Sequence, residues 1–236
     1  RTGLGGQYTV AQALLKIWKK TKAELIGICS PGVTETKGDD VEGYIKLIRD
    51  KHPELDAVKL VYVSTPDYKG TFQDGWEKAV VRMVEVLVEP AAEAARDPTR
   101  VNVLPGCHLS PGDLDELRTV IEDFGLVPTF LPDIAGSLDG HIPDDFTPTT
   151  IGGVGVDEVA RMGEAVHTLA IGAQMRAAFE RIFKETYEGK SSLTYYLTDD
   201  EIDRAFINFD GDAFPGSPSY DGFLSLLHPF IDKLYN

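Results

Sequence analysis

The sequence predicts an α/β fold, a Rossmann-like parallel sheet with flanking helices, followed by a mainly helical C-terminal segment. Three stretches favour this class: Ser30–Asp40, Val63–Trp76 and Val101–Gly112. Each begins at the end of an apolar β-branched run, breaks into Gly, Pro, Ser or Thr, and then opens an amphipathic helical pattern. In parallel sheets built from such units, ligands gather where strands end and helices begin.

The first elements follow from a change in hydrophobic period. Apolar residues at helical spacing predict a helix over Val10–Lys20, and the apolar run Leu25–Cys29 predicts a strand buried on both faces. Asp39 or Asp40 can cap a second helix, because a carboxylate accepts hydrogen bonds from the free N–H groups of the first turn. His52-Pro53 should end that helix, since a residue before proline avoids the helical conformation.

The second and third strands are expected at residues 60–63 and 101–104. A helix after Asp74 separates them, and its apolar face consists of Val80, Met83, Val84 and Leu87. Ser110 should begin the next helix, because serine caps, the following proline suits the first turn, and an acidic residue there faces the positive end of the dipole. Gly125 is placed to end it.

Residues 127–131 and 167–171 predict the fourth and fifth strands. Between them a glycine-rich turn leads into a helix over Val159, Met162 and Val166, and a last helix is expected at residues 173–187. Aromatic residues then become frequent, and the βα alternation is expected to stop. We therefore predict two domains, a Rossmann-like domain at residues 1–178 and a helical tail at residues 179–236.

Composition argues against several classes of function. Apolar residues make up 42% of the chain, enough for a packed core, and the net charge of −15 disfavours nucleic acid and membrane surfaces as partners. Two cysteines do not form a disulfide framework, so a cytoplasmic location fits best. No segment is apolar for the roughly 20 residues that span a bilayer. The chain starts with Arg1 rather than methionine, which is compatible with a cut end.

The cysteines and one histidine are candidates for metal or cluster chemistry. Cys107 and His108 follow the third strand, and a thiol beside an imidazole can bind a soft metal or act as nucleophile and base. Adjacent strand residues point to opposite sides, however, and the alternative is a packed thiol beside a loop histidine. Cys29 ends the first strand, where it could reach a cluster or serve as a small buried residue. Two cysteines cannot complete a four-thiolate iron–sulfur site.

Two loops contain groups that could bind ions. Asp139, His141, Asp144 and Asp145 could converge on a divalent ion or provide an acid–base pair, although a solvated acidic loop is the simpler interpretation. Residues 152–155, Gly-Gly-Val-Gly, resemble a phosphate-binding turn. Their order does not match a dinucleotide fingerprint, which favours a tight packing turn.

The tail contains a weak calcium-binding pattern. Residues 201–227 have the helix–loop–helix cadence of a calcium-binding hand, with Asp210, Asp212 and Asp221 at loop positions one, three and twelve. A phenylalanine and a proline fill positions that need an oxygen ligand and a glycine. The pattern therefore indicates a degenerate hand.

Five segments, covering most of residues 3–178, match a known family: 27–53, 61–80, 97–118, 122–158 and 162–176. Their long and specific runs include TETKGDD and AGSLDGHIPDDFTPTTIGG. On these residues the chain resembles the NifN family of nitrogenase iron–molybdenum cofactor biosynthesis proteins. These are relatives of the β subunit of the nitrogenase molybdenum–iron protein, in the nitrogenase component 1 family. The tail after residue 178 is unmatched.

The resemblance implies Rossmann-like layers and a scaffold role in nitrogen fixation rather than stand-alone catalysis. A subunit of this family pairs with a NifE-like subunit in a hetero-oligomer, on which a cofactor precursor is matured. The implied cofactor is an iron–sulfur cluster or iron–molybdenum cofactor precursor shared with that partner. The loops at residues 30–37, 65–71 and 106–110 are then expected near the partner or the cluster.

The chain departs from the family pattern at the cluster ligands. Family members are longer, and their upstream cluster-ligating cysteine does not occur in this sequence. The β subunit has a further cluster cysteine at the position of Gly32, so Cys29 is not an inherited ligand. Thr71 stands where that subunit has a serine near its cluster. We therefore treat Cys29, Thr71, Cys107 and His108 as candidates at the rim of the sheet, without assigned ligand roles.

Two other classes of function remain open. One is a structural or calcium-responsive binding module that acts through the tail. The other is a small-molecule enzyme of the Rossmann type, which lacks a phosphate fingerprint and a convincing nucleophile–base pair.

Overall fold

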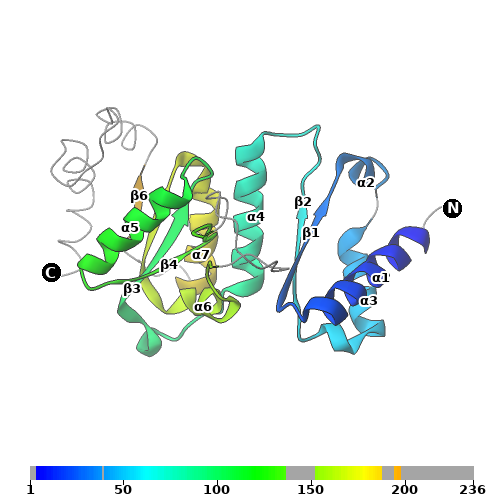
Figure 1. Cartoon of the computed structure of the whole chain (residues 1–236), viewed down its shortest axis with the longest axis horizontal. Helices are drawn as coiled ribbons and strands as arrows, with labels where there is room; N and C mark the ends of the chain where they lie inside the picture. Colours follow the sequence, from blue (N-terminus) through cyan, green and yellow to red (C-terminus); the bar gives the residue numbers. More distant parts are fainter. Residues whose placement is uncertain (1–3, 39, 137–151, 188–193, 198–236) are drawn as a thin grey trace, which may run out of the picture. The chain divides into compact units, whose positions relative to one another are not determined.

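Two parallel sheets, each formed by its own part of the chain, are the framework of the structure (Figure 1). The computed structural model describes residues 4–38, 40–136, 152–187 and 194–197. The chain divides into two compact units, Arg1–Leu87 and Val88–Asn236, and each unit contains one of the sheets. The predicted α/β class is confirmed, whereas the division of the strands between two sheets was not predicted.

The first unit places a two-stranded sheet between helices. In chain order its elements are α1 (Leu4–Thr21), β1 (Leu25–Ser30), α2 (Gly32–Thr36), α3 (Val41–Lys51), the 3₁₀ turn η1 (Pro53–Leu55), β2 (Lys59–Ser64) and α4 (Phe72–Leu87). β1 and β2 are parallel and paired over all six residues, so Ser30 and Ser64 lie side by side where the strands end. Figure 1 shows α1 and α3 on one side of this sheet and α4 on the other.

Apolar burial attaches these helices to the sheet. One cluster joins the inner faces of α1 and α3 to one face of the sheet: Ala11, Leu14, Leu15, Ile26, Ile48, Leu55, Val58 and Leu60. α4 packs against β2, with Val80 and Val84 fully buried. Since burial of one such side chain contributes about 1.5–3 kcal/mol, these contacts account for the position of each helix.

Acidic residues stabilise the starts of two of these helices. Asp40 caps α3, as predicted, because its carboxylate accepts a hydrogen bond of 2.9 Å from Gly43 N–H. α4 begins earlier than predicted, at Phe72, so Asp74 lies inside its first turn. The Thr71 N–H and hydroxyl both donate to the Asp74 carboxylate, and this contact stabilises the first turn of α4.

The second unit contains a four-stranded parallel sheet in the order β4-β3-β5-β6. In chain order its elements are η2 (Glu93–Ala95), β3 (Asp97–Pro105), α5 (Pro111–Asp123), β4 (Val127–Phe130), α6 (Val156–Ala160), η3 (Arg161–Glu164), β5 (Ala165–Ile171), η4 (Ala173–Met175), α7 (Arg176–Tyr187) and β6 (Thr194–Leu197). The central strands β3 and β5 are mostly buried, as strands covered on both faces should be.

α5 covers one face of this sheet and has the start and end that the sequence predicts. Ser110 and Asp113 form a capping box, and Gly125 follows the helix with φ of 75°. Its apolar face packs on the strands in one buried cluster: Val101, Val103, Leu114, Leu117, Val120, Ile121, Leu126, Phe130, Leu169 and Ile171.

The opposite face of the sheet contains a buried polar network. The Asn102 amide donates to the Met162 carbonyl (2.9 Å) and to the Thr168 hydroxyl (3.2 Å), which ties η3 to the two central strands. The buried Arg100 guanidinium donates to Glu158 of α6 at 2.8 Å. These contacts hold α6 and η3 against the sheet.

Two elements differ from the sequence prediction. The helix expected over Val159, Met162 and Val166 ends at Ala160, because η3 follows and β5 already begins at Ala165. The βα alternation does not stop near residue 178, since β6 pairs in parallel with β5. None of the described helices combines the length and apolar character needed to cross a bilayer.

Gly163 gives the first testable prediction. A Cβ at this position would overlap the Glu89 carbonyl oxygen and would lie 3.3 Å from Ala91 N. Because backbone atoms cannot move aside cheaply, Gly163→Ala should destabilise the second unit by about 1–3 kcal/mol, measured as a lower midpoint of urea unfolding. Gly75→Ala in α4 is the control, and its expected change in stability has the opposite sign, since nothing lies within 4 Å of the added Cβ. It should stabilise by about 0.5–1 kcal/mol, and equal effects would contradict the prediction.

The Arg100–Glu158 pair gives a prediction on pH. Donation from Arg100 is the main cause that lowers the pKa of Glu158 from its ordinary value of 4.5. A lowered pKa means that the folded chain binds the proton less readily than the unfolded chain. The stabilisation is therefore complete above about pH 5 and is lost as pH falls below 4.5 through the folded pKa.

Urea unfolding between pH 3 and pH 7 measures this contribution. Arg100→Met should remove most of the acid dependence that Glu158→Gln removes, because Arg161 also pairs with Glu158 at 3.3 Å, and the double variant should remove no more than Glu158→Gln alone. Additive losses in the double variant would show that the two side chains act separately.

Candidate functional site

The carboxyl ends of β1 and β2 form the first candidate site. Glu35 of α2 lies over these ends, where its carboxylate accepts hydrogen bonds from the Ser30 hydroxyl and, at 3.1 Å, from the Tyr62 hydroxyl. The Ser30 and Tyr62 oxygens are themselves 3.1 Å apart, and Ser64 also bonds to Glu35. One carboxylate thus joins the β1–α2 loop to both strands.

The hydrogen bonds of this cluster set its charge. Donation from Ser30, followed by Ser64, lowers the pKa of Glu35, so the side chain is an anion at neutral pH. Burial raises the pKa of the Tyr62 phenol, and the neighbouring Glu35 adds to this effect, so Tyr62 stays protonated and available as a donor. The cluster is therefore a stable anchor for the loop that follows β1.

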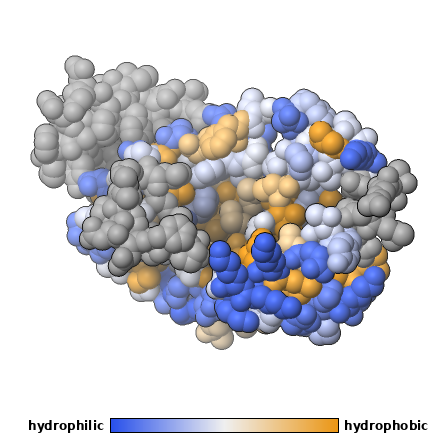
Figure 2. All heavy atoms as spheres, turned by 45° about the vertical axis from the view of Figure 1, so that its right-hand side comes forward, coloured by the Kyte–Doolittle hydropathy of each residue, from blue (hydrophilic) through white to orange (hydrophobic). Residues whose placement is uncertain are grey.

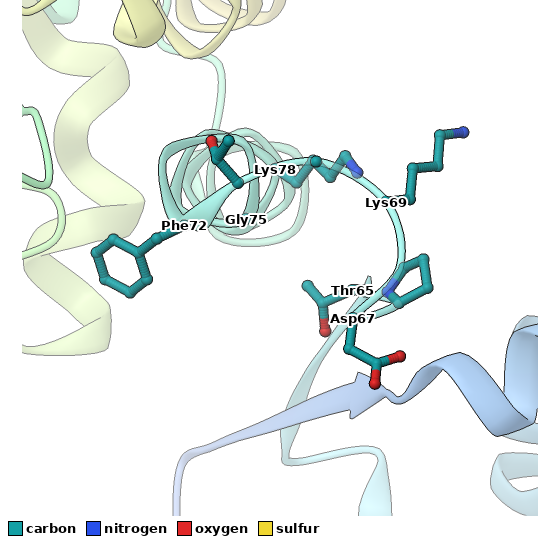
Figure 3. A pocket seen from close by; sticks show the side chains of 9 residues that line it. Thr65, Asp67, Lys69, Phe72, Gly75 and Lys78 are labelled. Atoms are coloured by element: carbon teal, nitrogen blue, oxygen red, sulfur yellow. The ribbon is translucent and has the colours of Figure 1, made fainter.

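A hollow of about 270 Å³ lies beside this anchor, in the loop between β2 and α4. In Figure 3 the Lys78 side chain extends from α4 toward the loop, Thr65 and Asp67 lie below it, and Lys69 points outward. The lining includes two lysines, although the chain as a whole has a net charge of −15. This hollow combines cationic side chains with hydroxyl groups.

Thr71, a candidate from the sequence, lines this hollow. Its hydroxyl donates to Asp74 at 2.8 Å, so its observed role is to stabilise the start of α4. Phe72 follows it, is 72% exposed, and contacts the Trp76 ring with the centroids 6.1 Å apart. Figure 3 shows the Phe72 ring pointing away from Lys78 and Asp67.

Further apolar side chains are exposed around the same loops. Tyr68 is 62% exposed and Val33 of α2 is 66% exposed. Gly32 allows Asp67 and Tyr68 to lie close to the start of α2, because a Cβ on Gly32 would collide with Asp67 and would lie 2.8 Å from the Tyr68 ring. Figure 2 shows hydrophobic residues at the surface between hydrophilic ones. The loops after β1 and β2 therefore present exposed apolar groups next to a charged hollow.

The second candidate site lies where β3 and β5 end. Cys107 and His108 follow β3, as expected, and they are the central residues of a turn. A hydrogen bond of 3.3 Å from Leu109 N–H to the Gly106 carbonyl closes this turn. The argument that the two side chains cannot act together, because neighbours on a strand point to opposite sides, therefore does not apply to them.

Gln174 of η4 connects the two side chains. Its Nε2 lies 3.3 Å from Nδ1 of His108, and its amide also bonds to the Cys107 thiol. Burial is the main cause that raises the pKa of this thiol. Cys107 is half-buried and His108 is exposed, so solvent reaches the cluster.

Cys29, the other cysteine among the candidates, lies on β1 next to Ser30 in the chain. It is exposed on β1, paired in register with Val63, so the alternative that it is a small buried residue is wrong. Within the part of the chain that the structure describes, no group of three or more His, Cys, Asp or Glu side chains could hold a metal ion. The candidates of the acidic loop and the calcium pattern lie outside the described residues: Asp139, His141, Asp144, Asp145, Asp210, Asp212 and Asp221.

Sequence reasoning missed the residues whose partners are distant in the chain. Tyr62 and Glu35 are 27 positions apart, and Gln174 and His108 are 66 apart. The position of Ser30 and Ser64 at the ends of two expected strands was the only signal available for the first cluster. Nothing in the sequence singled out Gln174.

Comparisons with known proteins support the resemblance seen in the sequence. The family model for the nitrogenase component 1 type oxidoreductases matches residues 1–193. The nitrogenase iron-molybdenum cofactor biosynthesis protein NifN of Bradyrhizobium diazoefficiens is 68% identical over 180 residues, which are 76% of this chain and 38% of that protein. The NifN protein of a Nostoc species is 39% identical over 217 residues, which are 91% of this chain and 48% of that protein.

A solved structure shows the same fold. Nitrogenase Cp1 at pH 6.5 superposes with a TM-score of 0.74 at 23% identity, over 97% of this chain and 50% of that chain. This chain spans less than half the length of the two NifN proteins. The family model covers most of the sequence and the solved structure confirms the α/β architecture. The chain therefore belongs to the nitrogenase component 1 type oxidoreductase family.

Proposed function

We propose that this chain is a NifN-like scaffold subunit, or part of one, for maturation of the nitrogenase iron–molybdenum cofactor. The observation that carries the proposal is the 68% identity over 180 residues to a NifN protein.

The hollow after β2 supports binding of an anionic precursor. Iron–sulfur clusters with thiolate ligands carry negative charge, and Lys69 and Lys78 provide positive charge in an acidic protein. Thr65 and Thr71 add hydroxyl groups to the lining. Because the described residues include only two cysteines, the proposal assigns the remaining cluster ligands to a partner.

The exposed side chains beside the hollow support a NifE-like partner. Val33, Tyr68 and Phe72 are each more than 60% exposed, and aromatic side chains are frequent anchors of protein interfaces. Val33 lies on α2 beside Glu35, whose hydrogen bonds to Ser30 and Tyr62 fix the β1–α2 loop without a partner, and Tyr68 lies against Gly32 of the same helix. A preformed loop lowers the entropy cost of association.

Co-purification with a tagged NifE-like chain tests the proposal. The wild-type chain should be retained, and Tyr68→Ser and Phe72→Ser should each weaken retention at least tenfold, because truncating a central aromatic anchor costs about 2 kcal/mol or more. Iron and acid-labile sulfide should accompany the anaerobically prepared complex, and Lys78→Glu should lower both.

Leu47→Ser is the matched control, since Leu47 is an exposed apolar residue on α3, 46% exposed, outside these loops. It should leave retention unchanged. Absence of the wild-type chain from the complex, or an equal loss with Leu47→Ser, would overturn the proposal.

A further inference from the structure

The β3 and β5 ends occupy a special place in the topology of the second unit. The chain leaves β3 toward β4 on one side, whereas it leaves β5 toward β6 on the other side. The segments that follow these neighbouring strands therefore diverge, and such a switch point leaves a crevice outside the carboxyl ends of the strands. The turn at Gly106–Leu109 and η4 border this point.

At this point the Cys107 thiol and a ring nitrogen of His108 both contact the side-chain amide of Gln174. Nε2 of Gln174 lies 3.3 Å from Nδ1 of His108, and the Gln174 side chain also forms a hydrogen bond with the Cys107 thiol. An imidazole nitrogen that faces an N–H donor presents its lone pair to that donor. The Cys107 sulfur and the His108 nitrogen thus both face the position that the Gln174 amide occupies.

Two glycines keep this region free of other atoms. A Cβ on Gly106 would lie 2.7 Å from Cε1 of His108 and 2.8 Å from Nε2 of Gln174. Gly172 has φ of 101°, which side chains rarely adopt, and its Cβ would lie 2.9 Å from the Gln174 amide. Gly106 therefore admits both His108 and Gln174, and Gly172 admits Gln174.

We propose that Cys107 and His108 form a binding site for a single soft or borderline metal ion, such as Zn²⁺, Co²⁺ or Cu⁺. Thiolate sulfur and imidazole nitrogen are the ligands that these ions prefer, whereas Mg²⁺ and Ca²⁺ prefer oxygen. The ion displaces the Gln174 amide and takes its place between the two donors. The thiol proton passes to solvent as the sulfur–metal bond forms.

The site is an exchange site rather than a permanent structural one. Structural zinc sites have four protein ligands, and here two are available, so solvent or an incoming ligand completes the coordination. The exposed position of His108 permits this access. The proposal is independent of the scaffold function, since it concerns one ion and needs no partner chain.

Titration of the reduced full chain with Co²⁺ alone tests the site. Cobalt bound to a thiolate gives near-ultraviolet charge-transfer absorption, which should saturate at one equivalent and disappear when Zn²⁺ is added. Cys107→Ser should abolish this absorption, and His108→Ala should weaken binding at least tenfold. Gln174→Ala should bind at least as tightly as the wild type, because no amide has to be displaced.

Cys29→Ser is the matched control, because Cys29 is the only other cysteine of the chain and is exposed on β1. It should keep the full absorption. Absorption that persists in Cys107→Ser, or that is lost in Cys29→Ser, would overturn the proposal, as would an unchanged affinity of His108→Ala. Circular dichroism of each variant confirms that the fold is retained.

Discussion

Parallel pairing of strands is the constraint on which the rest of the structure depends. Parallel neighbours run in the same direction, so their carboxyl ends and the loops that follow reach the same edge of the sheet. β1 and β2 pair over six residues without a shift, and β3 and β5 end together at Pro105 and Ile171. Both candidate sites lie at such edges. The buried apolar faces hold the strands in place, and the strand ends present the polar groups.

Each edge depends on a few contacts between residues far apart in sequence. Glu35 connects the β1–α2 loop to Tyr62 of β2, and Gln174 connects η4 to His108 in the loop after β3. Glycines at the same edges, such as Gly32 and Gly106, make room for these contacts. The shape of each edge therefore depends on these glycines as well as on the polar side chains.

The hollow after β2 is lined by more cationic than anionic side chains, although the net charge of the chain is negative. The net charge of −15 sets the long-range field, yet Lys69 and Lys78 line the hollow after β2. Salt screens the field of distant surface charges within about 8 Å at physiological ionic strength, so the charges that line the hollow, Lys69, Lys78 and Asp67, dominate the local field. On the proposed function, an anionic precursor at this edge would meet the lysines of the hollow rather than the average charge of the chain.

The sequence by itself determined the α/β class, the positions of the first five strands, the capping box at Ser110 and the family, because these depend on local hydrophobic period, turn chemistry and residue identity. It also identified Thr71, Cys107 and His108 as candidates. Only the tertiary structure decided that β6 joins the sheet, that Val166 lies on a strand, and that Glu35 and Gln174 complete the two edges. These features depend on which strands become neighbours. Packing between segments up to 66 positions apart decides which strands pair, and a local sequence pattern contains no information on such contacts.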